Sequence, residues 1–445
     1  MKRRREGCRS LGSAAVPSPR PSRVFYGWKV VGAGSVINAL QSGLIQQAFG
    51  SYAVVLEQEF GWSKTVFSGA YAFNRVESGL LGPIHGWALT RFGSRAVMRI
   101  GIVILALGFV AFSRIHTPAQ FMAAYFLMAV GSSFSGFLTI TTEAVRWFER
   151  HRSKALSLSS VGFAVGGLFI PAVVWALQTF GWRTTAVGSA VIVLVVALPL
   201  SSLFGHSPAS RHEHIDGIDP VDRPRTGPRA EGVSDVHFTA REALRTRAFW
   251  LLSFGHASAL LVVGSMIAHL SLYLTTEQGF SLQGAGLVFV GLTVFQLVGQ
   301  LVGGLLGDRM SKRLLCAGAM VGHMAALLLL TFATSAVLVW VFVVIHGLAW
   351  GIRGPLVNGL RADYFGSTSF GQILGFSSVI LMVGIVGGPL LAGVLADVTG
   401  SYRIGFTVLA FLAGAGLLFF TLASPPPPPV RSTAELETTR GGPAS

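Results

Sequence analysis

Two ten-residue segments at equivalent places in the two halves of this 445-residue chain decide its fold. Residues 86–95 read GWALTRFGSR and residues 304–313 read GLLGDRMSKR, so the second segment follows the first at an offset of 218 residues. The same offset lays Ser63–Arg91 over Ser281–Arg309, and long apolar runs flank both segments. Because self-similarity at a fixed offset indicates an internal repeat, we expect two halves of the same architecture.

The composition indicates a protein that is surrounded by lipid. Hydrophobic residues make up 51% of the chain and charged residues 12%, against about 25% charged residues in soluble domains. Apolar runs of about 20 residues, which cross a bilayer as helices, recur along the chain. We predict an all-α integral membrane protein with twelve transmembrane helices in two six-helix repeats, over residues 28–54, 63–88, 96–113, 118–143, 155–179, 184–204, 248–274, 282–306, 313–333, 337–360, 371–396 and 403–423.

A polar segment in the middle of the chain separates the two predicted halves. It contains seven basic and seven acidic residues and no apolar run of membrane-spanning length. The predicted domains are a basic cytoplasmic tail (1–24), an N-terminal six-helix bundle (25–204), a cytoplasmic linker (205–247), a C-terminal six-helix bundle (248–423) and a second cytoplasmic tail (424–445).

The basic residues predict the orientation in the membrane. With twelve spans, both termini lie on the same side of the membrane. Of the 34 lysines and arginines, 28 then lie on the side of the termini, four lie on the opposite side and two lie within spans. The positive-inside rule therefore puts both termini in the cytoplasm of a multi-pass plasma or inner membrane protein. The net charge of +15 flanks apolar runs rather than forming a soluble basic face, so no nucleic-acid partner is expected.

The sequence offers no set of residues for catalysis or for a cofactor. Cys8 and Cys316 are the two cysteines and lie far apart in the sequence, and no glycine cluster is followed by the Lys-Ser/Thr pair of a nucleotide site. We therefore expect neither an enzyme nor a bound cofactor or metal.

Residues 86–95 and 304–313 resemble the loop signature of the major facilitator superfamily, with Thr90 in the first copy where the second copy has Asp308. The resemblance covers about residues 25–423. It implies the major facilitator fold and a secondary transporter that works by alternating access. Several further segments are similar to the monocarboxylate-transporter-like group, which includes oxalate/formate antiporters: Phe25–Val31, Phe60–Ser63, Trp147-Phe148, Lys154–Leu156 and Gly181–Arg183.

Two arginines lie deep in predicted spans, where an ionised side chain needs a cavity or a partner. Arg75 and Arg353 are candidates for binding an organic anion, because a guanidinium presents a fork of donors that matches a carboxylate. Internal ion pairs with Glu77 or Glu143 are the alternative. Members of the resembled group carry a basic residue in span eight and often a lysine in span one or eleven; spans eight and eleven have none here, so the substrate class is not inherited.

Other polar residues within spans are further candidates. Asn38 and Gln41 are expected to line the central cavity with His346, and interhelical hydrogen bonds are the alternative for such amides. Proton coupling needs a group that titrates near physiological pH, and Glu77, His256 and His346 are the candidates. Hydrogen-bonded core residues are the alternative for the histidines, which include His269 and His323 as well.

The repeated loop segments supply candidates for gating. Asp308, Arg309 and Arg313 are expected to form a charge latch on the cytoplasmic side, with Arg91 and Arg95 as the matching half. The alternative for these cations is the positive-inside signal alone. The glycine pairs Gly162/Gly166 and Gly384/Gly388 are expected to be helix-packing faces, since small residues at this spacing let helices approach closely.

Together these features predict a carrier of a small organic anion, of the monocarboxylate kind, by proton symport or anion exchange. The expected partners are the substrate, the lipid bilayer and a coupling proton, and the expected state is a monomer. An efflux carrier for hydrophobic, drug-like compounds and a non-transporting membrane receptor or scaffold are the alternatives.

Overall fold

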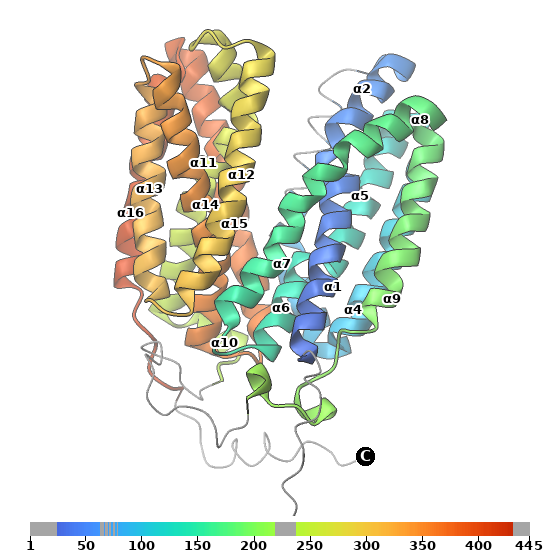
Figure 1. Cartoon of the computed structure of the whole chain (residues 1–445), viewed down its shortest axis with the longest axis vertical. Helices are drawn as coiled ribbons and strands as arrows, with labels where there is room; N and C mark the ends of the chain where they lie inside the picture. Colours follow the sequence, from blue (N-terminus) through green and yellow to red (C-terminus); the bar gives the residue numbers. More distant parts are fainter. Residues whose placement is uncertain are drawn as a thin grey trace, which may run out of the picture.

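The structure is a computed structural model that describes residues 25–62, 66, 70, 73, 76–77, 79–218 and 237–429. Every regular element in these ranges is helical, and the helices form two bundles that stand side by side (Figure 1). The N-terminal bundle contains α1 (Tyr26–Gln41), the π-helix η1 (Ser42–Gln47), α2 (Phe49–Phe60), α4 (Gly82–Phe112), α5 (Pro118–Ser135), α6 (Phe137–Trp147), α7 (Arg152–Gly166), η2 (Gly167–Phe169), α8 (Ile170–Ile192), η3 (Val193–Ala197) and α9 (Leu198–Ser201).

The C-terminal bundle follows a linker that holds two short 3₁₀ turns, η4 (Ala209–Arg211) and η5 (Ile215–Gly217). Its helices begin with a short amphipathic turn and continue as six long apolar helices. They are α10 (Ala240–Leu244), α11 (Arg247–Thr276), α12 (Leu282–Gly307), α13 (Lys312–Thr331), α14 (Ala336–Phe365), α15 (Phe370–Thr399) and α16 (Tyr402–Leu422).

Two glycines interrupt what would otherwise be unusually long helices. Gly93 in α4 and Gly181 in α8 both have φ near 77°, a left-handed conformation that glycine adopts without steric penalty. The arm of α4 before Gly93 packs on α15, whereas the arm after it packs on α5 through Gly101 and Gly108. Helices α4 and α8 therefore each consist of two helical arms that meet at a bend, at Gly93 in α4 and at Gly181 in α8.

Nine helices in the described ranges are long and apolar enough to cross a membrane, which makes the chain a multi-pass membrane protein. One of the nine runs from Arg152 to Ser201 and contains the bend at Gly181, and another is α4 with its bend at Gly93. In the segment predicted as the second span (63–88), residues 63–65, 67–69, 71–72, 74–75 and 78 lie outside the described residues. The count of twelve spans stays a prediction.

Each bundle has its own apolar core, and the paired glycines pack helices within it. Residues buried in the first bundle include Phe109 and Trp147, and those buried in the second include Phe249 and Phe342. A Cβ on Gly162 or Gly166 would meet the backbone of α1, and one on Gly384 or Gly388 would meet the backbone of α11. The prediction that these glycines are packing faces is confirmed.

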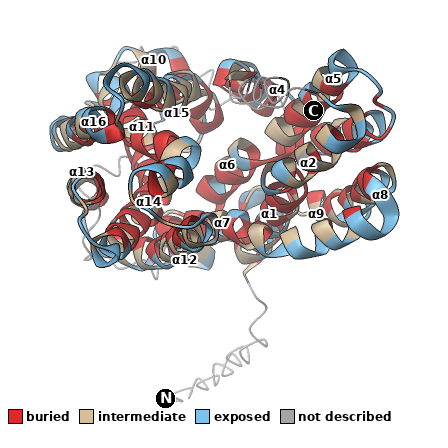
Figure 2. Ribbon diagram, turned by 90° about the horizontal axis from the view of Figure 1, so that it is seen from above, coloured by how far each residue is buried: buried red, intermediate tan, exposed pale blue. Residues whose placement is uncertain are grey.

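The two bundles touch each other near the end of the molecule that carries the linker, which we call the linker end (Figure 1). Here α15 packs on α4, and α7 packs on α12 and α14 (Figure 2). Close approaches include Gly82 to Ser378, Gly86 to Gly371, and Gly304 to Ser157. The ribbons diverge toward the opposite end (Figure 1), so the molecule is closed at the linker end.

Candidate functional site

A group of basic side chains is buried inside the C-terminal bundle. Arg353 and Arg361 lie on α14 and are each only 1% exposed, and His256 on α11 is half-buried beside them. Pro355, inside the same helix, has no N–H with which to bond the carbonyl of Gly351. We call Arg353, Arg361, His256, His323 and His346 the cationic cluster.

The cationic cluster has no acidic counterpart among the described residues. The Nη1 atom of Arg361 donates to Asn358 Oδ1 at 2.9 Å and lies 3.3 Å from His256 Nδ1. The Nε and Nη1 atoms of Arg353 and the Nε and Nη2 atoms of Arg361 are buried with no hydrogen-bond acceptor in the described part of the chain. Two buried guanidinium groups are therefore left with unsatisfied donors, an arrangement that costs several kcal/mol unless an anion or water completes it.

His323 and His346 form a pair at one end of the cluster. Their Nδ1 atoms are 3.2 Å apart and both rings are fully buried. Because one nitrogen must donate and the other accept, the two rings hold opposite tautomers when both are neutral. His346 and Arg353 lie on the same helix, α14, and both histidines are within electrostatic range of that arginine.

The polar candidates of the N-terminal bundle are engaged in contacts between helices. Asn38 Nδ2 donates to the carbonyl of Ser159 at 2.9 Å, and Gln41 Nε2 donates to Ser135 Oγ at 2.8 Å. Glu77 is 4% exposed, whereas Arg75 lies outside the described residues. In this conformation both amides therefore form hydrogen bonds between helices, which is the alternative given above to lining a cavity.

A buried aspartate connects the two bundles at the linker end. Asp363 on α14 accepts a hydrogen bond from Arg152 Nη1 on α7 and another from Lys312 Nζ on α13, each at 2.5 Å. All three side chains are less than 8% exposed. We call these three residues the aspartate bridge. In it, the Asp363 carboxylate binds one cation of the N-terminal bundle, Arg152, and one cation of its own C-terminal bundle, Lys312.

Two further carboxylates lie at the start of α7. Asp308 accepts from the backbone N of Ser153 at 2.9 Å, and Asp216 of the linker accepts from the backbone N of Glu149, Arg150 and His151 at 3.2, 2.7 and 3.1 Å. The Ser153 amide belongs to the first turn of α7, whose N–H groups have no partner within the helix and favour an anion, whereas Asp216 binds the amides of the turn that precedes α7. Burial raises the pKa of the Asp308 carboxyl above its ordinary value, although the Ser153 amide stabilises the charged form.

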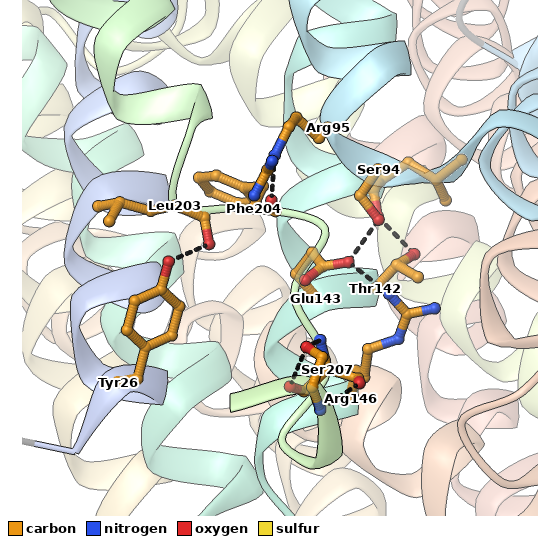
Figure 3. A network of polar contacts seen from close by, with 11 residues as sticks. Tyr26, Ser94, Arg95, Thr142, Glu143, Arg146, Leu203, Phe204 and Ser207 are labelled. Atoms are coloured by element: carbon orange, nitrogen blue, oxygen red, sulfur yellow. Dashed lines mark hydrogen bonds and ion pairs between the residues drawn. The ribbon is translucent and has the colours of Figure 1, made fainter. Parts of the chain in front are cut away.

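The other predicted gating residues lie apart from these contacts. Arg95 holds the start of the linker through the carbonyls of Phe204 and Ser202 at 2.9 and 3.0 Å (Figure 3). Arg91 and Arg309 are exposed and Arg313 is half-buried, and none of them makes an ion pair within the described residues. Of the five predicted residues, Asp308 is the one with a described hydrogen bond to the other bundle.

Arg361 and the aspartate bridge are functional candidates that the sequence pattern does not predict. The span predicted over 337–360 ends before Arg361, but α14 continues to Phe365 and buries this arginine. Asp363 and Arg152 are 211 residues apart, so only the packing of the two bundles brings them together. The one signal for the aspartate bridge in the sequence was Asp363 itself, an acidic residue just beyond the span predicted over 337–360.

Comparisons with known proteins agree with this architecture. The chain matches the family model of the Major Facilitator Superfamily over residues 33–352 and 252–443. It is 26% identical over 412 residues to mouse monocarboxylate transporter 11, and the alignment covers 89% of this chain and 87% of that protein. It is 22% identical over 396 residues to the oxalate:formate antiporter of Oxalobacter formigenes, with 86% and 88% covered.

Among solved structures, the E. coli fucose:proton symporter FucP in its outward conformation superimposes with a TM-score of 0.68. The match covers 90% of this chain and 98% of FucP at 15% sequence identity. At that identity the likeness is one of fold.

Proposed function

Because this chain belongs to the Major Facilitator Superfamily, we propose that it carries a small organic anion of the monocarboxylate class across the membrane by alternating access. The observation that carries this proposal is the cationic cluster. Two arginines, each 1% exposed and with unsatisfied donors, give the C-terminal bundle an excess of buried positive charge. A carboxylate would satisfy both the charge and the paired N–H geometry of a guanidinium.

The relatives support the same substrate class. Mouse monocarboxylate transporter 11 and the oxalate:formate antiporter are both named for small carboxylates, and both align with most of this chain. The absence of basic residues from residues 282–306 and 371–396 leaves Arg353 and Arg361 as the described basic residues deep in the C-terminal bundle. We propose that they take the substrate-binding role in this half.

We further propose that the linker end faces the cytoplasm of a plasma or inner membrane. The distribution of 28 basic residues on that side supports this orientation. The contacts at the linker end then correspond to a carrier closed toward the cytoplasm, and transport requires that the aspartate bridge and the Asp308 contact break in each cycle. Charge balance comes from a co-transported proton or from an exchanged anion.

The test is flux into liposomes that contain the purified protein and a pH-sensitive dye. Adding lactate, pyruvate, formate or oxalate outside should acidify the lumen faster than in empty vesicles if a proton accompanies the anion. Exchange should instead appear as uptake of a radiolabelled acid that requires an unlabelled acid inside.

The variants separate a substrate site from a structural role. Arg353→Gln should reduce flux at least tenfold, whereas Arg403→Gln, the same change at an exposed arginine of α16, should leave it within twofold. Arg353→Lys keeps the charge without the fork and should retain part of the flux. Folded Arg353→Gln protein with undiminished carboxylate flux would refute the assignment, as would silence of the wild type in both assays.

A further inference from the structure

A basic pocket lies on the outer surface of the N-terminal bundle, at the end opposite the linker. It has a volume of about 340 Å³ and sits where the end of α4 meets the second arm of α8. Both helices belong to one bundle, so this pocket is separate from the contact between the bundles. Its lining residues are Ser113, Arg114, His116, Arg183, Thr184 and Val187.

The arginine on α8 is held in place before any ligand arrives. Arg183 Nη1 pairs with Glu59 Oε1 at 2.6 Å, and its guanidinium carbon lies 4.3 Å from the ring centre of Trp182. Arg114 is exposed and makes no described ion pair. The two arginines give the pocket more positive than negative charge, because Glu59 is the one acid that pairs with either of them among the described residues.

Apolar stripes lead away from this pocket along both helices. On α8, Val187, Val191 and Val195 are 42%, 53% and 66% exposed and follow one another at four-residue spacing, which places them on one face. On α4, Leu107 and Val110 are 56% and 42% exposed. The two helices pack against each other, and each presents its apolar stripe on the outside of the bundle below the basic rim.

Exposed aromatic residues mark the level of the membrane surface at this end. Trp175 and Phe180 are 60% and 55% exposed, and their rings stack edge to face at 5.4 Å just before the bend at Gly181. Aromatic side chains of this kind concentrate at the boundary between acyl chains and headgroups. The pocket lies beside the same bend, which places it at headgroup depth.

We propose that this pocket binds the phosphate group of an anionic phospholipid, with the acyl chains lying along the stripes of α4 and α8. Arginine pairs with phosphate oxygens through its fork of donors, and basic pockets between transmembrane helices suit lipid headgroups. A dissolved phosphate would use the same arginines but would gain nothing from the apolar surface. The juxtaposition of a basic rim and apolar stripes therefore favours a lipid.

The experiment measures thermal unfolding of the full-length protein in detergent during titration with lipids. Phosphatidylglycerol should raise the unfolding midpoint in a saturable way, and phosphatidylcholine of the same chain length should not. Arg114→Gln should weaken the apparent affinity for phosphatidylglycerol about tenfold, in the range of one charge-assisted hydrogen bond. Arg403→Gln, at the same end of the other bundle, should leave it unchanged.

Three results would overturn the proposal. Equal shifts with phosphatidylcholine would show that headgroup charge is not recognised. An equal shift with inorganic phosphate or glycerol phosphate would assign the pocket to a dissolved anion. An unchanged affinity in Arg114→Gln would place the lipid elsewhere.

Discussion

The two bundles share an architecture but treat buried charge in opposite ways. In the N-terminal bundle the fully buried Glu143 accepts hydrogen bonds from Ser94 Oγ and from Arg146 Nη1 (Figure 3). In the C-terminal bundle Arg353 and Arg361 are equally buried, and no carboxylate of the described chain pairs with them. The buried acid Glu143 thus has a cationic partner in its own bundle, whereas the two buried arginines have no acidic partner among the described residues, which leaves positive charge for a ligand.

The largest effect should follow from removing the acid that joins the two halves. Asp363→Asn leaves Arg152 and Lys312 buried without a counterion, and breaking a buried ion pair costs about 3–5 kcal/mol. A cysteine placed at Ser157, which contacts Gly304 in the closed interface, reports the opening through its maleimide labelling rate. The rate should rise at least about 100-fold, since each 1.4 kcal/mol is a factor of ten.

The matched control is Asp397→Asn, the same change at an exposed aspartate on α15. It should leave the labelling rate at Ser157→Cys unchanged. An unchanged rate in Asp363→Asn would mean that the aspartate bridge does not hold the linker end closed.

A new carboxylate inside the cationic cluster should abolish the difference between the halves. Cys316 is fully buried within electrostatic range of Arg353 and Arg361, so Cys316→Asp supplies the missing counter-charge. Carboxylate flux should fall at least tenfold because the internal anion competes with the substrate, while the unfolding midpoint does not fall. The neutral isostere Cys316→Asn should keep flux within about threefold; equal losses in both variants would contradict the competition.

Acid should favour the closed linker end through Asp308. Burial raises the pKa of this carboxyl in the closed state above the ordinary value of 3.8 that it regains when exposed. The closed state therefore binds more protons between these two pKa values, and its stability falls as pH rises through that window. The labelling rate at Ser157→Cys, divided at each pH by the rate of the same maleimide with a free thiol, should fall about two- to fivefold on acidification, and Asp308→Asn should remove this dependence. A pH response that persists in Asp308→Asn would assign it to another group.

The smallest effect should come from the paired charge of the N-terminal bundle. In Glu143→Gln the amide oxygen still accepts from Ser94, and Arg146, whose side chain is 44% exposed, returns to solvent. The free energy of unfolding should change by less than about 1 kcal/mol, and carboxylate flux should stay within twofold. A loss of flux as large as in Arg353→Gln would show that both halves depend on their buried charges.

The sequence predicted the features that appear as local violations of hydropathy or as repeats. Arg353 was found because a charge within an apolar run is costly, and the glycine pairs because their spacing is that of a close helix contact. The partners of buried charges could not be found in this way. Asp363 meets Arg152 across 211 residues, and Arg361 is buried only because α14 continues past it. Such contacts depend on how the helices pack, which periodicity does not encode.

The linker carboxylate Asp216 has a consequence for the free energy that opening requires. Its three hydrogen bonds go to the N-terminal bundle, and Glu213 and Arg211 beside it also contact Tyr26 of that bundle. When the linker end opens, Asp308 leaves with the other bundle but Asp216 stays. A contact that is present in both conformations contributes nothing to the free-energy difference between them, so the free energy that opening requires depends on the aspartate bridge and the Asp308 contact and not on these linker bonds.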